Sequence, residues 1–247
     1  MRREEIREQV RLVFDDSKQR FGSRKIHAIL AERGIRVSTG YIVELMREMG
    51  LQSVGRHSKK EHQKKTILLK RQDKLKQQFN VSEPNKIWIS DVTCFKVKDK
   101  YYYICVIIDL FSRKVIAYGV SPINSTYLIT STLKRALKDR NYPKQLTFHS
   151  DRGSQYTSKA FSNLLHMNKV VQSFSRSGQP LDNAVAEGFF STLKKEELYR
   201  VDFKSEQEFR GNVDDYIVFY NTKRPHGTLA YKTPERFETI FQEKQNV

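Results

Sequence analysis

The sequence is poor in cysteine and in long apolar runs, and each shortage excludes a class of protein. Its 247 residues include two cysteines, Cys94 and Cys105, both in strand-like stretches. We expect them to be small buried side chains in a reducing compartment, not a disulfide framework. The six histidines show no zinc-ligand spacing with these cysteines. No apolar run approaches a membrane span, and residues 1–5 lack a signal peptide's apolar stretch, so we expect a cytoplasmic protein with no membrane partner.

Acidic side chains are also in the minority. The chain has 45 Lys and Arg against 28 Asp and Glu, a formal net charge of +17, which favours a polyanionic partner. Residues 51–80 alone carry 9 basic and 2 acidic side chains. A solvated charged helix would usually mix both signs, so we expect a linker or helix that lies along DNA phosphates. Its candidate contacts are Lys59, Lys60, Lys64 and Lys65.

Three of the acidic residues stand where a metal-dependent nuclease needs them. Asp91 lies inside a strand-like run, where an unpaired buried charge would be costly and a metal ion is a natural partner. Asp151 follows the apolar run 146–148 and precedes a glycine loop, at the carboxyl end of an expected strand, where α/β sheets present ligand-binding groups. Glu187 lies in a helix expected to begin near Asp182. Two divalent ions held by such oxygens clamp the attacking and leaving oxygens of a phosphoryl displacement.

The helix that carries Glu187 brings a cation to the same face. Lys194 lies seven residues after Glu187 and returns to almost the same angle around the helix. Both border an apolar arc made of Val185, Ala186, Phe189, Phe190 and Leu193. Lys194 is therefore either a site residue or a solvated lysine on the helix surface.

Asp109 is a further candidate for a metal-binding carboxylate. It closes the apolar run 103–108 and is followed by a segment typical of a hairpin between two strands. A carboxylate at this position could bind metal, or it could cap the turn by accepting backbone N–H groups. We favour the cap.

Periodicity divides the chain into a helical and a mixed part. Helices are expected at residues 3–16 and 23–33, with Gly34 ending the second and Ser38 capping a third. This is the helix-turn-helix arrangement of DNA-binding domains, and the basic Arg24 and Lys25 suit that role. Strands are expected at 86–97, 101–109 and 114–121, followed by alternating helices and strands at 125–140, 145–149, 158–167, 169–174, 182–199 and 205–221. The predicted fold class is α/β, a mixed sheet flanked by helices and preceded by a small all-helical domain.

The domain boundaries follow from this pattern. We expect a helix-turn-helix domain at 1–52, a basic linker or helix at 53–82, a catalytic core at 83–200 and a C-terminal helical extension at 201–247 that packs on the core.

Several motifs together resemble one family. Thirty-five residues separate Asp151 from Glu187, the interval found in that family's superfamily. The sequence is similar to the IS-three family of insertion-sequence transposases, second-reading-frame type. The similarity is carried by residues 20–51, 88–93, 149–156, 182–187 and 220–226. That family belongs to the superfamily of DDE transposases and retroviral integrases. The resemblance runs from about residue 21 to residue 237. It implies a ribonuclease-H-like core in which Asp91 on the first strand meets Asp151 after the fourth.

The resemblance also implies a reaction. The expected enzyme cleaves the ends of an insertion element and joins the freed 3′-hydroxyl to DNA, with Asp91, Asp151 and Glu187 as catalytic metal ligands for two Mg²⁺ ions, for which Mn²⁺ can substitute. Lys194 matches the basic position that touches DNA near the reacting phosphate. Arg224, in the closing motif, ends a helix and is a further candidate phosphate contact.

The implied partners are double-stranded DNA, as terminal inverted repeats and target, and further copies of the chain. A first-frame (OrfA) product is a possible partner or fusion segment, and the expected location is the bacterial nucleoid. Two alternatives stay open: a catalytically silent, transposase-derived DNA-binding regulator, and a structure-specific nuclease with the same fold.

Overall fold

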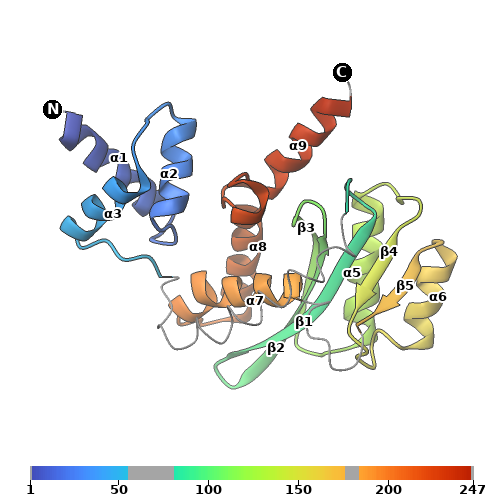
Figure 1. Ribbon diagram of the computed structural model, residues 1–247. Helices are drawn as coiled ribbons and strands as arrows, with labels where there is room; N and C mark the ends of the chain where they lie inside the picture. The colour runs from blue at the N-terminus through green and yellow to red at the C-terminus, as the bar shows by residue number, and fades with distance from the viewer. Residues whose placement is uncertain (1, 55–80, 176–183, 246–247) are drawn as a thin grey trace. The chain divides into compact units, whose positions relative to one another are not determined.

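The computed structural model describes residues 2–54, 81–175 and 184–245 (Figure 1). The basic segment with Lys59, Lys60, Lys64 and Lys65 lies outside the described residues. The chain divides into two compact units. The first comprises Met1–Arg71 and Pro225–Lys232, and the second comprises Gln72–Arg224 and Thr233–Val247.

The first unit contains the three helices predicted near the N-terminus, α1 (Arg2–Asp16), α2 (Ser23–Glu32) and α3 (Thr39–Glu48). Gly34 adopts a φ of +80° directly after α2, a conformation that favours glycine, and Ser38 caps α3 by accepting the backbone N–H of Tyr41. The helices share a core of Ile6, Val10, Val13, Phe14, Ile26, Leu30, Ile42, Leu45 and Met46. Helix, glycine turn and capped helix therefore form as predicted.

The second unit is built on one five-stranded sheet in the order β3-β2-β1-β4-β5. Its strands are β1 (Ile87–Val97), β2 (Lys100–Asp109), β3 (Val115–Ser121), β4 (Thr147–Ser150) and β5 (Val171–Phe174). The first three pair antiparallel, whereas β4 runs parallel to β1 and β5 runs parallel to β4. The mixed sheet is thus confirmed, and the first three strands match their predicted bounds to within one residue.

Strands β4 and β5 each begin two residues later than predicted, for a backbone reason. Gln145 has a φ of +59° and Lys169 a φ of +55°. Strand backbone requires negative φ, so neither residue can start a strand.

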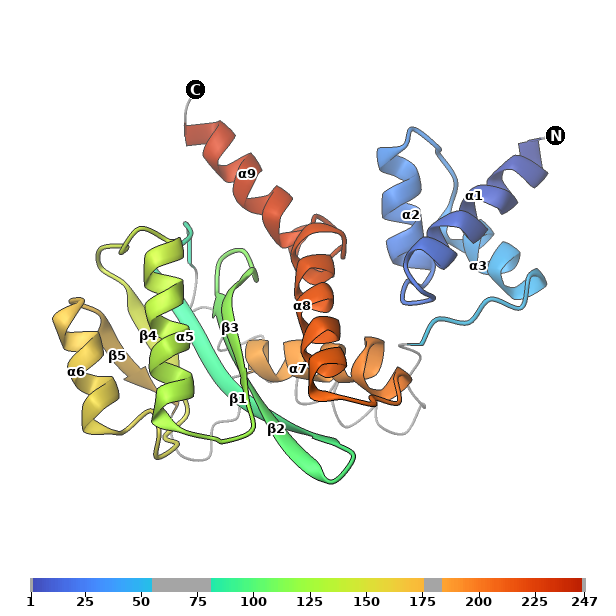
Figure 2. The same cartoon turned by 180° about the vertical axis from the view of Figure 1, so that it is seen from behind.

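Helices cover both faces of the sheet (Figures 1 and 2). On one face, α5 (Thr126–Asp139) and α6 (Lys159–Met167) pack over a core that includes Trp88, Phe148 and Phe161. On the other, α7 (Ala184–Glu196) and α8 (Glu206–Thr222) pack over a core that includes Phe189 and Phe209. The short turns η2 (Leu198–Arg200) and η3 (Gly227–Leu229) and the helix α9 (Pro234–Gln245) complete the described elements.

Close packing of α5 on the sheet depends on a glycine in β3. A Cβ atom added to Gly119 would lie 2.7 Å from Thr132 Oγ1 and 2.9 Å from Leu128 Cδ1. Because these atoms belong to a buried helix face, a larger residue would push α5 off the strand.

One prediction about the strands is wrong. Cys105 is buried as expected, but Cys94 is exposed. The reason is the length of β1. Its partner β4 pairs only from Ile87 to Ile89, whereas β1 continues with β2 to Val97. The distal part of this hairpin extends beyond the helices on the α5 side, so side chains on that face meet solvent (Figure 2).

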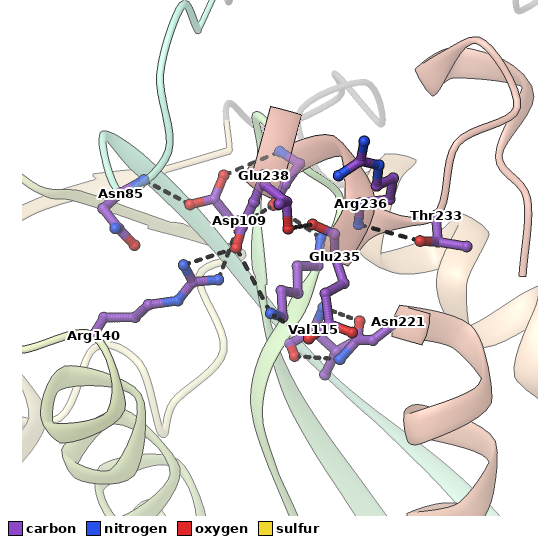
Figure 3. Close-up of polar contacts among 12 residues, drawn as sticks. Asn85, Asp109, Val115, Arg140, Asn221, Thr233, Glu235, Arg236 and Glu238 are labelled. Carbon is purple, nitrogen blue, oxygen red and sulfur yellow. Dashed lines mark hydrogen bonds and ion pairs between the residues drawn. The ribbon is translucent and has the colours of Figure 1, made fainter. Parts of the chain in front are cut away.

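The turn between β2 and β3 confirms the structural role predicted for Asp109. Its side chain is fully buried, with Oδ2 accepting the N–H of Asn85 at 2.7 Å and Oδ1 accepting those of Phe111 and Ser112 at 2.8 and 3.2 Å. Burial raises the pKa of Asp109, and the N–H groups of Asn85 and Ser112 act in the opposite direction. Asp109 therefore holds this turn together (Figure 3).

The same turn anchors α9. Glu238 is buried, accepts two hydrogen bonds from Arg140 at 2.8 and 3.0 Å and a third from Ser112 Oγ at 2.6 Å (Figure 3). Phe111 also packs against Phe237 and Phe241. The C-terminal helix is thus part of the second unit's folded structure. No helix within the described ranges is long and apolar enough to cross a membrane.

Candidate active site

The two aspartates of the predicted triad come from adjoining parallel strands. The last register pair between β1 and β4 is Ile89 with His149, and Asp91 and Asp151 each follow two residues later. Neighbouring strands lie about 4.8 Å apart, so equal offsets along parallel strands bring the two carboxylate-bearing residues to the same level, side by side. Asp91 lies within β1 and is half-buried, while Asp151 directly follows β4 and is exposed.

Short local hydrogen bonds orient both carboxylates. Asp91 Oδ1 accepts the backbone N–H of Val92 at 2.8 Å, and Asp151 Oδ1 accepts that of Gly153 at 3.0 Å. A Cβ atom on Gly153 would lie 3.0 Å from the same Asp151 oxygen. A side chain at position 153 would therefore crowd this oxygen, which would have to shift by a few tenths of an ångström.

A buried hydroxyl pair ties the Asp151 loop to β1. The hydroxyls of Ser90 and Tyr156 lie 2.7 Å apart, and both residues are buried. Burial raises the pKa of Tyr156 well above its usual value, so its hydroxyl stays protonated. Ser90 precedes Asp91 and Tyr156 follows Asp151 by five residues, so this bond fixes the two carboxylate-bearing segments to each other. The sequence pattern did not indicate either residue.

Helix α7 carries Glu187 in its first turn and Lys194 in its last. The predicted apolar arc is confirmed, with Ala186, Phe189, Phe190 and Leu193 buried and Glu187 exposed at its edge. Lys194 Nζ donates to Thr93 Oγ1 at 2.8 Å. Thr93 lies two residues after Asp91, on the same face of β1. Lys194 is therefore held beside the strand of Asp91 and is not simply a solvated lysine.

A buried ion pair at the end of α7 accounts for Arg224. Its guanidinium donates to both carboxylate oxygens of Glu196 at 2.9 Å, and Tyr216 donates to Glu196 at 3.0 Å. The side chains of Arg224 and Glu196 are 13% and 6% exposed. Burial alone would lower the pKa of Arg224, but the bonds and attraction to Glu196 outweigh it and raise that pKa. A DNA phosphate would have to compete with Glu196, so this placement counts against the phosphate contact predicted for Arg224.

Glu196 had a signal in the sequence that was missed. It lies seven residues after Phe189 and three after Leu193, so it belongs to the buried arc of α7. A charged residue on an apolar helix face indicates a buried ion pair, because an unpaired charge there would be costly.

The predicted DNA contacts of the first unit both lie in the first turn of α2. Arg24 is exposed, and Lys25 is half-buried with its Nζ 5.1 Å from the centre of the Phe21 ring. Glu44 and Glu48 on α3 are both bonded to Arg3, at 3.4 and 2.7 Å. This pairing offsets acidic charge on the helix that would follow the turn of a helix-turn-helix motif.

The three carboxylates do not form one closed group. Within residues 2–54, 81–175 and 184–245, no three His, Cys, Asp or Glu side chains come together as potential metal ligands. Asp91 and Asp151 lie side by side through the strand register, whereas Glu187 lies in the first turn of α7, which follows residues 176–183 outside the described part of the chain. All three are oxygen donors, the ligand type that hard divalent cations select.

Comparisons with known proteins decide the family. Residues 81–180 and 168–234 match two models of an integrase core domain, and residues 1–60 match an HTH-like domain. A transposase for insertion sequence element IS904 of Lactococcus lactis is 35% identical over 238 residues, which cover 96% of this chain and 94% of that protein. The chain belongs to the IS-three family of insertion-sequence transposases. The transposase InsF for insertion sequence IS3A of Escherichia coli is 32% identical over 91% of this chain and 79% of its own length.

The transposase fold extends to viral integrases. The catalytic core domain of HTLV-2 integrase, solved in complex with magnesium, superposes with a TM-score of 0.53 and 20% identity, covering 64% of this chain and 98% of that one. The second unit of this transposase therefore has the ribonuclease-H-like integrase fold predicted from its motifs, preceded by an HTH-like domain.

Proposed function

We propose that this transposase hydrolyses the phosphodiester bonds at the ends of its element and then joins the freed 3′-hydroxyl to a second DNA strand. The observation that carries the proposal is the register of β1 and β4, which brings Asp91 and Asp151 to the same level on adjacent strands of an integrase-type sheet. Lys194, on the helix that carries Glu187, bonds to β1 two residues beyond Asp91.

The donor set fits divalent metal ions. Asp91, Asp151 and Glu187 would hold two Mg²⁺ ions, or Mn²⁺ in their place, and HTLV-2 integrase, which shares this fold, was solved with magnesium. The chemistry supplied by such ions is stabilisation of the attacking and leaving oxygens of an in-line displacement.

The remaining residues of the site orient these carboxylates and the DNA. The bonds from Val92 and Gly153 aim the two aspartates, and the hydroxyl pair of Ser90 and Tyr156 keeps their segments together. Lys194 would place a DNA phosphate beside the carboxylates, because its bond to Thr93 holds the ammonium charge next to β1, on a helix fixed by its apolar arc. No covalent protein intermediate is needed, since a water molecule or the 3′-hydroxyl serves as nucleophile.

DNA binding would be shared among three parts of the chain. The helix-turn-helix domain at 1–52, with Arg24 and Lys25, would hold the terminal inverted repeats, and the basic segment at 53–82 would follow their phosphates. The core at 83–200 would bind the target DNA mainly through contacts with the DNA's sugar-phosphate backbone, supported by the extension at 201–247. Two element ends react together, so we propose that copies of the chain assemble on DNA in the bacterial nucleoid, with a first-frame product as a further partner or fusion segment.

The test is a strand-joining assay. The protein is incubated with labelled duplexes cut from the ends of its own element and with a plasmid target, in Mg²⁺ and in EDTA. Covalently joined products in Mg²⁺ alone support the proposal. Binding without cleavage in either condition would favour a silent DNA-binding regulator, and cleavage without joining would favour a structure-specific nuclease.

A further inference from the structure

The face of the β1–β2 hairpin on the α5 side, and the loop after β3, carry exposed aromatic and apolar side chains that the proposed reaction does not use. The register places Cys94, Tyr103 and Ser121 in one row across three strands, and Lys96 beside Tyr101 in the next row. These rows face the α5 side, because residues of the same parity on β1 and β2, such as Trp88 and Cys105, belong to the core under α5.

This surface continues into the loop that follows β3. Ile123 lies two residues beyond Ser121, and Tyr127 lies in the first turn of α5, just before the Leu128 side chain that contacts Gly119 of β3. Tyr101, Ile123 and Tyr127 are 54%, 67% and 79% exposed. We call Lys96, Tyr101, Ile123 and Tyr127 the hairpin platform.

The platform adjoins the loop that follows Asp151. The carboxyl ends of β3 and β4 lie at the same end of the sheet, since both strands run parallel to β1 (Figure 2). Gln155, in the loop after Asp151, donates through Nε2 to the carbonyl of Asn124 at 3.3 Å. Asn124 directly follows Ile123 of the platform, so the platform adjoins the Asp151 loop, while its rows lie on the opposite face of β1 from Asp91 and Thr93.

The rim of the platform is basic. Lys96, Lys98 and Lys100 are exposed around the tip of the hairpin, with Asp99 as the single acidic residue among residues 95–102. Exposed rings beside closely spaced cations match the chemistry of single-stranded nucleic-acid sites, where bases stack on aromatic side chains and cations follow the phosphates. A duplex hides the faces of its bases, so only the lysines could engage it.

We propose that the hairpin platform binds a single-stranded segment of DNA beside the Asp151 loop, with Tyr101 and Tyr127 stacking on unpaired bases. This inference rests on the proposed function for the source of the strand. It differs from that function in its residues, because the platform contains none of the three carboxylates and needs no metal.

The test measures binding without catalysis. In EDTA, the affinities of the full-length protein for a fluorescent thymidine oligonucleotide and for a duplex of equal length are measured by anisotropy. The double variant Tyr101→Ala/Tyr127→Ala should bind the single strand about 30-fold or more weakly, from the usual loss per stacked base, and the duplex as before. The matched control is Tyr142→Ala, which removes a tyrosine that is 58% exposed just beyond the other end of α5 and should change neither affinity.

A second measurement uses the unsubstituted chain. Cys94 is exposed in the row next to the platform, whereas Cys105 is buried. The single strand should slow the alkylation of Cys94 by a maleimide, and the duplex should not.

Several results would overturn the inference: unchanged single-strand affinity in the double variant, equal losses on both forms of DNA, or a changed oligomeric state with normal DNA binding. Because strand joining by the wild-type protein in Mg²⁺ is scored separately, failure of the platform and failure of the proposed reaction give different results.

Discussion

The buried pair of Glu196 and Arg224 should be the most stability-sensitive polar contact of α7. Glu196 accepts three hydrogen bonds, two from Arg224 and one from Tyr216, and both members of the ion pair are almost fully enclosed. Replacing Glu196 with methionine keeps the apolar packing but leaves the Arg224 charge buried without its partner. Such losses cost about 3–5 kcal/mol.

The magnitude can be read from a melting curve. For a protein of this size, each kcal/mol lowers Tm by about 2–4 °C, so Glu196→Met should lower the Tm of the second unit by about 6–20 °C. The matched control is Glu243→Ala, which removes an ion pair with Arg236 on α9 in which both side chains are more than half exposed. That loss should cost at most about 1 kcal/mol.

A double variant separates the ion pair from simple packing. Glu196→Met/Arg224→Met removes both charges, and similar replacements of buried pairs are often close to neutral. We therefore expect the double variant to be more stable than Glu196→Met alone in circular-dichroism melts. If Glu196→Met costs no more than Glu243→Ala, the account of Arg224 as a buried structural residue is refuted, and its role as a phosphate contact becomes the better interpretation.

Three further predictions test other parts of the chain. Lys194→Ala should reduce strand joining at least about 10-fold with a Tm change of at most a few degrees, since its bond to Thr93 is one half-buried contact; unchanged activity per folded molecule would make Lys194 a structural residue. Burial raises the pKa of Cys105 to about 11, so its contribution to stability is present below the ordinary thiol pKa and lost only as pH rises through about 11. Mass spectrometry after iodoacetamide treatment at pH 8 should therefore find Cys94 alkylated and Cys105 intact, and rapid modification of both would contradict the described burial. Replacing four lysines of the basic segment with alanine should weaken duplex binding at low salt and flatten the dependence of duplex affinity on salt concentration: Lys59, Lys60, Lys64 and Lys65. An unchanged salt dependence would exclude these side chains as phosphate contacts.

The architecture of the second unit was predictable because its signals are local. Segments rich in Ile, Val and Tyr and separated by short turns predicted β1, β2 and β3 to within one residue, and the helices expected at 125–140 and 205–221 match α5 and α8 to within one residue at each end. The role of Asp109 also followed from local chemistry, since a carboxylate at a hairpin turn can accept nearby N–H groups.

What the sequence could not supply depends on distant parts of the chain. Cys94 is exposed because β1 extends well beyond the three residues that pair with β4, and no local sequence pattern indicates this difference in strand length. The bond of Ser90 with Tyr156 joins residues 66 positions apart, and that of Glu196 with Arg224 joins residues 28 apart. Its place in the closing motif made Arg224 a candidate for DNA, and only the tertiary fold gives it a carboxylate partner instead.

The most direct test of the central claim compares two aspartates that differ in their contacts. Asp151→Asn keeps the side-chain shape but removes the negative charge that a metal ligand needs, so strand joining in Mg²⁺ should collapse while DNA affinity and Tm stay near wild type. Asp109→Asn removes an acceptor from a turn in which both oxygens are engaged, so it should cost about 1–3 kcal/mol of stability and leave joining per folded molecule largely intact. Strand joining by Asp151→Asn at the wild-type rate, with joining abolished in folded Asp109→Asn, would contradict the assignment of Asp151 to the reaction and Asp109 to the fold.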